Sequence, residues 1–128
     1  MENCKILIVD DISTNVTLIS TIIRKKLGAE YDTALSGEEA LEKIETFKPQ
    51  IIILDLMMPG TDGWDVIRAV RAKYAKDEMA IIVTSAITDG VNVAECYDLG
   101  VNDYLEKPIV QEALLTTIRT QAEKLKQA

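Results

Sequence analysis

Short runs of branched aliphatic residues alternate with longer amphipathic segments along this chain of 128 residues. Three of the runs are almost wholly apolar, as expected for strands that are buried on both faces of a sheet. These runs are Lys5–Val9, Ile51–Leu54 and Ala80–Val83. Two more polar segments, Glu30–Leu35 and Val101–Leu105, suit strands nearer the edges. The pattern predicts five strands, with the three most apolar ones in the centre of the sheet.

A segment with apolar residues at helical spacing follows each predicted strand. Ser13 is placed to cap the first helix, and Ser36 with Glu39 forms the sequence pattern of a capping box for the second. The expected helices are Val16–Leu27, a segment that ends before Pro49, a segment around Ile67 and Val70, Val91–Leu99, and a last helix from Val110 onward. Strict alternation of strand and helix predicts an α/β fold with a parallel sheet covered on both faces, because parallel strands require crossover connections.

Acidic, hydroxyl and amino side chains stand at the ends of four of the five predicted strands. Asp10 and Asp11 follow the first strand, Asp55 ends the third, Ser85 follows the fourth and Lys107 follows the fifth. Open parallel sheets bind ligands at the carboxyl ends of their strands, so these side chains are expected to converge there. Taken singly, the aspartates could cap a helix or form a turn, and the serine and lysine could simply face solvent. Their joint occurrence at four strand ends favours a common site.

Three carboxylates in one place need a counter-ion, and a hard divalent cation such as Mg²⁺ prefers carboxylate and carbonyl oxygens. Lys107 would supply a further positive charge, and the Ser85 hydroxyl could donate a hydrogen bond to a phosphoryl oxygen. These are the parts of a phosphoryl-transfer site in which Asp55 is the nucleophile and an acyl phosphate is the product. The sequence therefore predicts a magnesium-dependent phosphoryl acceptor.

Composition narrows the classes of function. The formal net charge is −7 at pH 7, which argues against direct binding to nucleic acid or to an anionic membrane. The chain contains no histidine, so any imidazole base, imidazole metal ligand or phosphohistidine must come from a partner. No apolar run approaches the roughly 20 residues that span a bilayer, and the N-terminus lacks a signal-peptide pattern, so a cytoplasmic location is expected. Cys4 and Cys96 form no metal or redox motif and are expected to be reduced.

Four segments resemble, in order, the motifs of the receiver domain of bacterial two-component response regulators. They are Val9–Asp11, Leu54–Gly63, Val83–Ala86 and Asp103–Pro108. The resemblance covers the whole chain and implies a single receiver domain over residues 1–128. It also implies a flavodoxin-like, three-layer (βα)5 fold with a five-stranded parallel sheet of order 2-1-3-4-5, an order known from other members of the family.

The resemblance assigns roles to individual residues at the expected site. Asp55 resembles the phosphoacceptor, and Asp10 and Asp11 resemble the acidic pair that holds Mg²⁺, Asp11 directly. Met57 occupies the position whose backbone carbonyl is the third protein ligand of the metal. Lys107 resembles the lysine that contacts the phosphoryl group. The implied function is a signalling switch that catalyses its own phosphotransfer.

The switch residues follow from the same resemblance. Thr84 and Ser85 both offer the hydroxyl of the switch position, and the spacing to the acceptor and to the lysine favours Ser85. Tyr104 resembles the aromatic switch residue, and the bond before Pro108 resembles one that is cis in the family. Phosphorylation is expected to change the surface of the fourth helix, the fifth strand and the fifth helix.

The implied partners are a sensor histidine kinase or histidine phosphotransfer protein as phosphodonor, and an unknown output domain or protein. The sequence leaves open whether the receiver stands alone or belongs to a longer regulator or hybrid kinase. Met57 and Ile87 lie two residues after the acceptor and the switch hydroxyl, where some relatives carry polar side chains that orient the hydrolytic water. Slow loss of the phosphoryl group is therefore expected.

Two other classes of function compete with this interpretation. A pseudo-receiver would be an interaction module that never takes a phosphoryl group, although the complete acidic and lysine set argues against it. The second class is an enzyme or cofactor protein on a similar sheet, such as a phosphohydrolase or a flavin carrier. A Mg²⁺-dependent phosphohydrolase would typically carry a second aspartate where Met57 stands. A flavin carrier would want a hydroxyl-rich and glycine-rich loop after the first strand, where Asp10 and Asp11 would repel a phosphate.

Overall fold

The computed structural model describes residues 4–127 and contains a five-stranded parallel sheet. The strands are β1 (Lys5–Val9), β2 (Glu30–Ala34), β3 (Ile51–Asp55), β4 (Ala80–Ala86) and β5 (Asp103–Lys107). They lie in the order β2-β1-β3-β4-β5, which confirms the predicted flavodoxin-like topology. The three most apolar strands are the central ones, as predicted.

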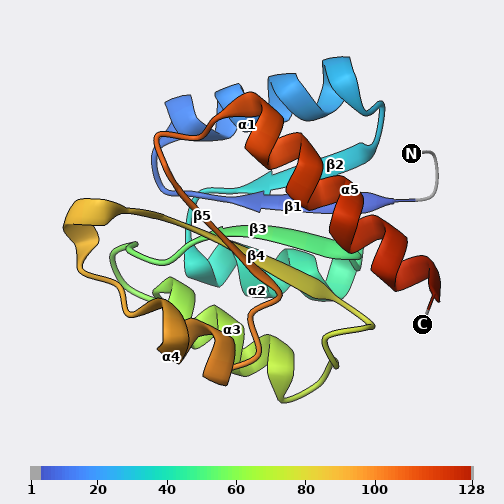
Figure 1. Ribbon diagram of the computed structural model, residues 1–128. Helices are drawn as coiled ribbons and strands as arrows, with labels where there is room; N and C mark the ends of the chain where they lie inside the picture. The colour runs from blue at the N-terminus through green and yellow to red at the C-terminus, as the bar shows by residue number, and fades with distance from the viewer. Residues whose placement is uncertain (1–3, 128) are drawn as a thin grey trace.

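Helices connect the strands and cover both faces of the sheet. They are α1 (Ser13–Lys26), α2 (Gly37–Phe47), α3 (Gly63–Arg71), α4 (Val93–Asp98) and α5 (Gln111–Gln127), with a short 3-10 turn η1 (Ile87–Asp89) before α4. Helices α1 and α5 lie on one face, and α2, α3 and α4 lie on the other (Figure 1). None of the helices among residues 4–127 has the length and apolar character needed to cross a membrane.

The core has two halves because successive side chains of a strand point to opposite faces of the sheet. In β1, Leu7 packs under α2 and α3, whereas Ile6 and Ile8 pack under α1 and α5. The residues of β3 alternate in the same way, with Ile52 in the first half and Ile53 in the second. Coverage on both faces explains why the central strands are continuous apolar runs instead of alternating ones.

Several predicted boundaries were wrong by a few residues. Strand β4 continues to Ala86, so Ser85 lies within the strand and does not follow it. Strand β5 begins at Asp103, two residues after the predicted start, because Val101 is fully buried in the preceding loop. The fourth helix begins at Val93 instead of Val91, because η1 and Gly90 occupy the space before it. Val110 precedes α5 and is 62% exposed, so it does not belong to the buried stripe of that helix.

Of the two predicted helix caps, the one at Ser13 was wrong and the one at Ser36 was right. Ile12 is the N-cap of α1 and makes no side-chain hydrogen bond, so Ser13 lies inside the helix and is not its cap. Ser36 caps α2 as predicted, with its Oγ accepting from the backbone N–H of Glu39 at 3.1 Å. The Glu39 carboxylate accepts from the N–H of Leu35, one residue before the partner that a capping box requires. Cys4 and Cys96 are free and buried thiols.

Candidate functional site

The carboxylates of Asp10, Asp11 and Asp55 lie together at the carboxyl ends of β1 and β3. One oxygen of each lies within 4.8 Å of the others. Asp55 is 3% exposed and Asp10 is 1% exposed, whereas Asp11 is open to solvent. Parallel pairing of β1 with β3 sets Val9 beside Leu54, so the chain turns out of both strands at the same level. The structure thus brings together the three carboxylates that the sequence singled out.

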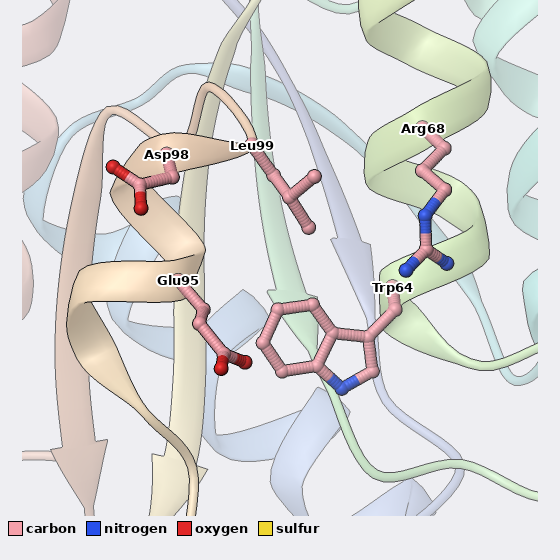
Figure 2. Close-up of a pocket in the computed structure, with 5 residues that line it drawn as sticks. All are labelled: Trp64, Arg68, Glu95, Asp98 and Leu99. Atoms are coloured by element: carbon pink, nitrogen blue, oxygen red, sulfur yellow. The ribbon is translucent and has the colours of Figure 1, made fainter.

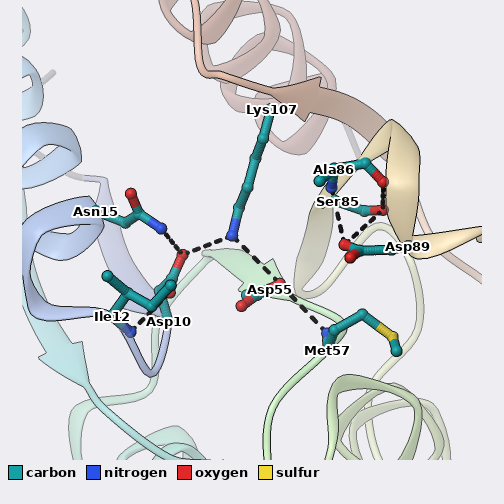
Figure 3. Close-up of polar contacts among 9 residues, drawn as sticks. All are labelled: Asp10, Ile12, Asn15, Asp55, Met57, Ser85, Ala86, Asp89 and Lys107. Atoms are coloured by element: carbon teal, nitrogen blue, oxygen red, sulfur yellow. Dashed lines mark hydrogen bonds and ion pairs between the residues drawn. The ribbon is translucent and has the colours of Figure 1, made fainter.

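Lys107 extends across this cluster from the end of β5. Its Nζ lies 3.0 Å from Oδ2 of Asp10 and 3.4 Å from Oδ1 of Asp55 (Figure 3). The peptide bond between Lys107 and Pro108 is cis, as the resemblance implied. Burial alone would lower the pKa of Lys107, but its hydrogen bond to Asp10 and the charges of both aspartates outweigh burial and raise the pKa. The lysine therefore remains charged beside the carboxylates.

Burial raises the pKa of Asp55 to about 6. The nearby charge of Lys107 and the backbone N–H of Met57, which donates to Oδ1 of Asp55 at 3.3 Å, oppose this rise, while the charge of Asp10 adds to it. A carboxylate of this kind is costly to keep ionised without a further cation. The site therefore favours binding of positive charge close to Asp55.

Asp10 also accepts hydrogen bonds from residues at the start of α1, so it has a structural role as well as a place in the site. Its Oδ1 accepts from the backbone N–H of Ile12 at 2.9 Å, and its Oδ2 accepts from the amide of Asn15 at 3.2 Å. Sequence reasoning missed Asn15, although its place one turn into the helix after an acidic turn was a usable signal. These bonds fix the Asp10 carboxylate toward the cluster, and its structural and site roles coexist.

Ser85 is fully buried near the end of β4, but its hydroxyl does not contact the carboxylate cluster. The Oγ atom donates to the carbonyl oxygen of Ala86 at 3.2 Å and lies 3.5 Å from Oδ2 of Asp89 (Figure 3). Thr84, the alternative switch hydroxyl, pairs in register with Asp55 and is also buried. Asp89 was not predicted, because nothing in its sequence context distinguishes it from an ordinary turn aspartate.

The other predicted residues surround the site without closing it. The side chain of Met57 is 50% exposed and points away from Asp55, and Ile87 is 73% exposed (Figure 3). Tyr104 is half-buried and packs against the core half under α2, α3 and α4. The structure therefore places an exposed apolar side chain in the loop that follows the acceptor and an aromatic ring on strand β5.

The loop that follows β3 is held by the start of α2, a contact that sequence reasoning missed. The backbone N–H of Thr61 donates to the Glu38 carboxylate at 2.8 Å, and these hydrogen bonds from Thr61 lower the pKa of Glu38. A Cβ atom on Gly37 would lie 2.0 Å from the Thr61 carbonyl oxygen, so only glycine permits this approach. The loop carrying Met57 is thus anchored at its far end.

A groove of about 490 Å³ lies between α3 and α4, lined by Trp64, Arg68, Glu95, Asp98 and Leu99 (Figure 2). None of the residues of the carboxylate cluster lines it. Trp64 is the chain's single tryptophan and also packs against the core.

Comparison with known proteins identifies the family. A family model described as the response regulator receiver domain matches residues 6–119. The DNA-binding response regulator MtrA of Mycobacterium tuberculosis is 33% identical over 117 residues, which cover 90% of this chain and 49% of MtrA. The hybrid signal transduction histidine kinase L of Dictyostelium discoideum is 34% identical over 121 residues, covering 90% of this chain and 7% of the kinase.

A solved structure agrees with these matches. The receiver domain of the Francisella response regulator 1452 superposes with a TM-score of 0.84 at 29% identity, covering 95% of this chain and 98% of that domain. The chain spans about half the length of the MtrA relatives that it matches. The chain belongs to the response regulator receiver domain family, which supports a general role in phosphorylation-dependent signalling.

Proposed function

We propose that residues 1–128 form one receiver domain in which Asp55 accepts a phosphoryl group from a phosphohistidine of a partner protein. The observation that carries the proposal is the position of Asp55 at the carboxyl end of the central strand β3. Its carboxylate is buried, lies beside those of Asp10 and Asp11, and is 3.4 Å from the Lys107 ammonium. A nucleophilic carboxylate and a positive charge for the incoming phosphoryl oxygens are thus next to each other.

The transfer itself needs a nucleophile and little covalent chemistry from the protein. A carboxylate oxygen of Asp55 forms a bond to phosphorus while the phosphorus–nitrogen bond of the partner's phosphohistidine breaks. The bonding pair goes to the imidazole nitrogen, and the product on this chain is an acyl phosphate. Lys107 is placed to stabilise the negative charge on the transferred phosphoryl oxygens, because its Nζ already lies near Asp55.

The residues at the site fit Mg²⁺. Two buried carboxylates and an exposed one converge within 4.8 Å, and Lys107 is the cation paired with them among the described residues. Three negative charges against one positive charge leave room for a hard divalent cation. Asp10, Asp11, Asp55 and the backbone carbonyl of Met57 would hold the ion. Bound Mg²⁺ would neutralise charge on the phosphoryl group.

The change after phosphorylation would pass through Ser85 and Tyr104. The acyl phosphate carries about −1.5 to −2 charge in place of the single negative charge of the Asp55 carboxylate, and it offers three strong acceptor oxygens near Ser85. The Ser85 hydroxyl would turn toward these oxygens, and Tyr104, which is only half-buried, would move inward on β5. The surface formed by α4, β5 and α5 then takes a second state that an output domain or protein reads.

The rim of the site suits a protein partner as phosphodonor. One exposed apolar side chain follows each of the five strands: Ile12, Leu35, Met57, Ile87 and Val110. Exposed apolar side chains around a polar centre are typical of interaction surfaces. We therefore propose that a histidine kinase or histidine phosphotransfer protein docks on this rim with its phosphohistidine over Asp55.

Incubation with Mg²⁺ and acetyl phosphate tests the proposal. Intact-mass spectrometry should show one added phosphoryl group on the wild-type protein and none on Asp55→Asn. Asp62→Asn is a matched control, because Asp62 caps α3 and is not part of the carboxylate cluster. It should be phosphorylated like the wild type. An unmodified wild-type protein would contradict the proposal and favour a phosphorylation-independent interaction module.

A further inference from the structure

The turn after β4 contains a carboxylate that the proposed phosphoryl transfer does not use. Asp89 ends η1, and its Oδ2 accepts from the backbone N–H of Ala86 at 2.9 Å and lies 3.5 Å from the Ser85 Oγ. The buried Ser85 hydroxyl has a single proton, and its neighbours here, the Asp89 carboxylate and the Ala86 carbonyl, are both acceptors. That proton is therefore directed into the turn and not toward Asp55 (Figure 3).

We propose that Asp89 is a positioning residue that competes with the phosphoryl group on Asp55 for the hydrogen bond of the Ser85 hydroxyl. The inference rests on the proposed function, since it takes Asp55 as the acceptor. In the unmodified protein the Asp89 carboxylate favours the outward position of Ser85. The phosphoryl oxygens offer a competing negative acceptor, and the balance between the two sets how fully the protein switches.

Asp89 also links the Ser85 hydroxyl to the start of α4. Its bond to Ala86 N–H closes η1, and Gly90 follows with a φ of +66°. Asn92 then caps α4 by accepting from the N–H of Glu95 at 3.2 Å. When Ser85 turns away, Asp89 keeps only its backbone donor, and the turn that leads into α4 loses one of its ties. The competition therefore affects the surface formed by α4, β5 and α5 as well as the acceptor Asp55.

Asp89→Asn separates the two roles of this side chain. The amide oxygen can still accept from the Ala86 N–H, so the turn keeps its cap. The same atom, Oδ2 of Asp89, faces both the Ala86 N–H and the Ser85 Oγ, so in Asp89→Asn a neutral amide oxygen replaces a charged acceptor and holds the Ser85 hydroxyl less strongly. Asp89→Ala removes this acceptor altogether. Both variants should release Ser85, although Asp89→Ala also loses the cap.

Beryllium fluoride with Mg²⁺ provides a non-covalent mimic of the phosphoryl group, and ¹⁹F NMR measures its binding directly. Asp89→Asn should bind it about three- to tenfold more tightly than the wild type, the range expected when a competing charge-assisted hydrogen bond is replaced by a neutral one. In a Ser85→Ala background the same substitution should change affinity by less than about twofold. Asp62→Asn, which removes a capping carboxylate elsewhere, should leave the affinity unchanged.

The double-mutant comparison decides between competition and a general charge effect. Equal tightening by Asp89→Asn with and without the Ser85 hydroxyl would overturn the inference, because removal of a negative charge alone would then explain it. No tightening in either background would also overturn it, and Asp89→Ala should repeat the Ser85 dependence. Failure of the wild type to bind the mimic would contradict the proposed function itself, and the inference with it.

Discussion

The amino ends and the carboxyl ends of the strands use polar side chains in opposite ways. We call these two ends the amino edge and the carboxyl edge of the sheet. At the amino ends of β4 and β5, Arg71 donates to the carbonyl oxygens of Gly100 at 2.7 Å and Met79 at 2.8 Å, and to Oδ1 of Asn102 at 2.7 Å. Asn102 in turn accepts from the N–H of Ile81 at 2.8 Å. Burial lowers the pKa of Arg71, yet in the part of the chain that the structure describes its hydrogen bonds go to uncharged acceptors.

At the carboxyl ends the polar groups are mostly of one sign. Asp10, Asp11 and Asp55 gather around Lys107, and burial raises the pKa of Asp55 to about 6. The amino edge therefore resembles a closed structural network, and the carboxyl edge resembles a site that is complete only with a bound cation or phosphoryl group. The amino edge thus adds to the stability of the domain, whereas the carboxyl edge gives up some stability in order to bind a cation or a phosphoryl group.

The largest expected effect is at the amino edge. Arg71→Ala should lower the free energy of unfolding by about 3 kcal/mol, because it leaves several partly buried acceptors without a donor. Urea denaturation monitored by circular dichroism measures this change. Arg68→Ala is the matched control, since Arg68 is exposed and makes only a 3.5 Å ion pair with Asp65. It should cost less than about 0.5 kcal/mol, and an equal cost for both would contradict the network.

A smaller effect of opposite sign is expected at the carboxyl edge. Asp55→Asn should stabilise the metal-free protein by about 2 kcal/mol at pH 7.5, because it removes a buried charge. The folded-state pKa of Asp55, about 6, lies above the ordinary value of 3.8 for an aspartate, so ionisation of Asp55 destabilises the fold increasingly as pH rises from 3.8 through about 6.

The pH dependence of the stability gained by Asp55→Asn distinguishes a charge effect from a packing effect. Urea unfolding of the wild type and Asp55→Asn should give similar stabilities near pH 4, where Asp55 is protonated in the folded state. The two should separate as pH rises toward 7. A gain that is equally large at pH 4 would show that the charge of Asp55 is not its cause.

Binding of Mg²⁺ should then offset part of the stability that the carboxyl edge gives up. At ten times the dissociation constant, Mg²⁺ should raise the free energy of unfolding of the wild type by about 1.4 kcal/mol. Asp11→Asn should abolish most of the increase, and because Asp11 is exposed, its loss costs little stability by itself. Thermal denaturation with and without Mg²⁺ measures both. A full Mg²⁺ response in Asp11→Asn would remove Asp11 from the metal site.

The carboxyl edge was largely predictable from the sequence, and the amino edge was not. Asp10, Asp55 and Lys107 stand directly at strand ends, so the topology of a parallel sheet is enough to bring them together. Arg71 bonds mainly to backbone carbonyls, including that of Gly100, 29 residues along the chain, and backbone acceptors leave no mark in a sequence. The contact of Ser85 with Asp89 depends on side-chain rotation and was equally invisible.

The errors in the predicted boundaries of strands and helices have a related cause. Val101 has the β-branched, apolar character of a strand residue, but it is buried in the loop that Arg71 holds in place. Ser13 has the composition of a helix cap, but the carboxylate of Asp10 already accepts from the N–H of Ile12. In both places a tertiary contact or a neighbouring side chain took the role that local propensity had assigned to another residue.

The smallest expected effect concerns water at the acceptor. Met57 lies two residues after Asp55 and its apolar side chain cannot orient a hydrolytic water, so Met57→Asn should speed loss of the phosphoryl group about fivefold, or about 1 kcal/mol in the barrier. Phosphate release after removal of acetyl phosphate measures the rate. Met57→Leu is the matched control and should stay slow, while both variants keep the backbone carbonyl proposed for Mg²⁺. Equal rates in Met57→Asn and the wild type would mean that the residue after the acceptor does not limit hydrolysis. If loss of the phosphoryl group is nevertheless slow, the exposed apolar side chain of Ile87, two residues after Ser85, is the next candidate cause.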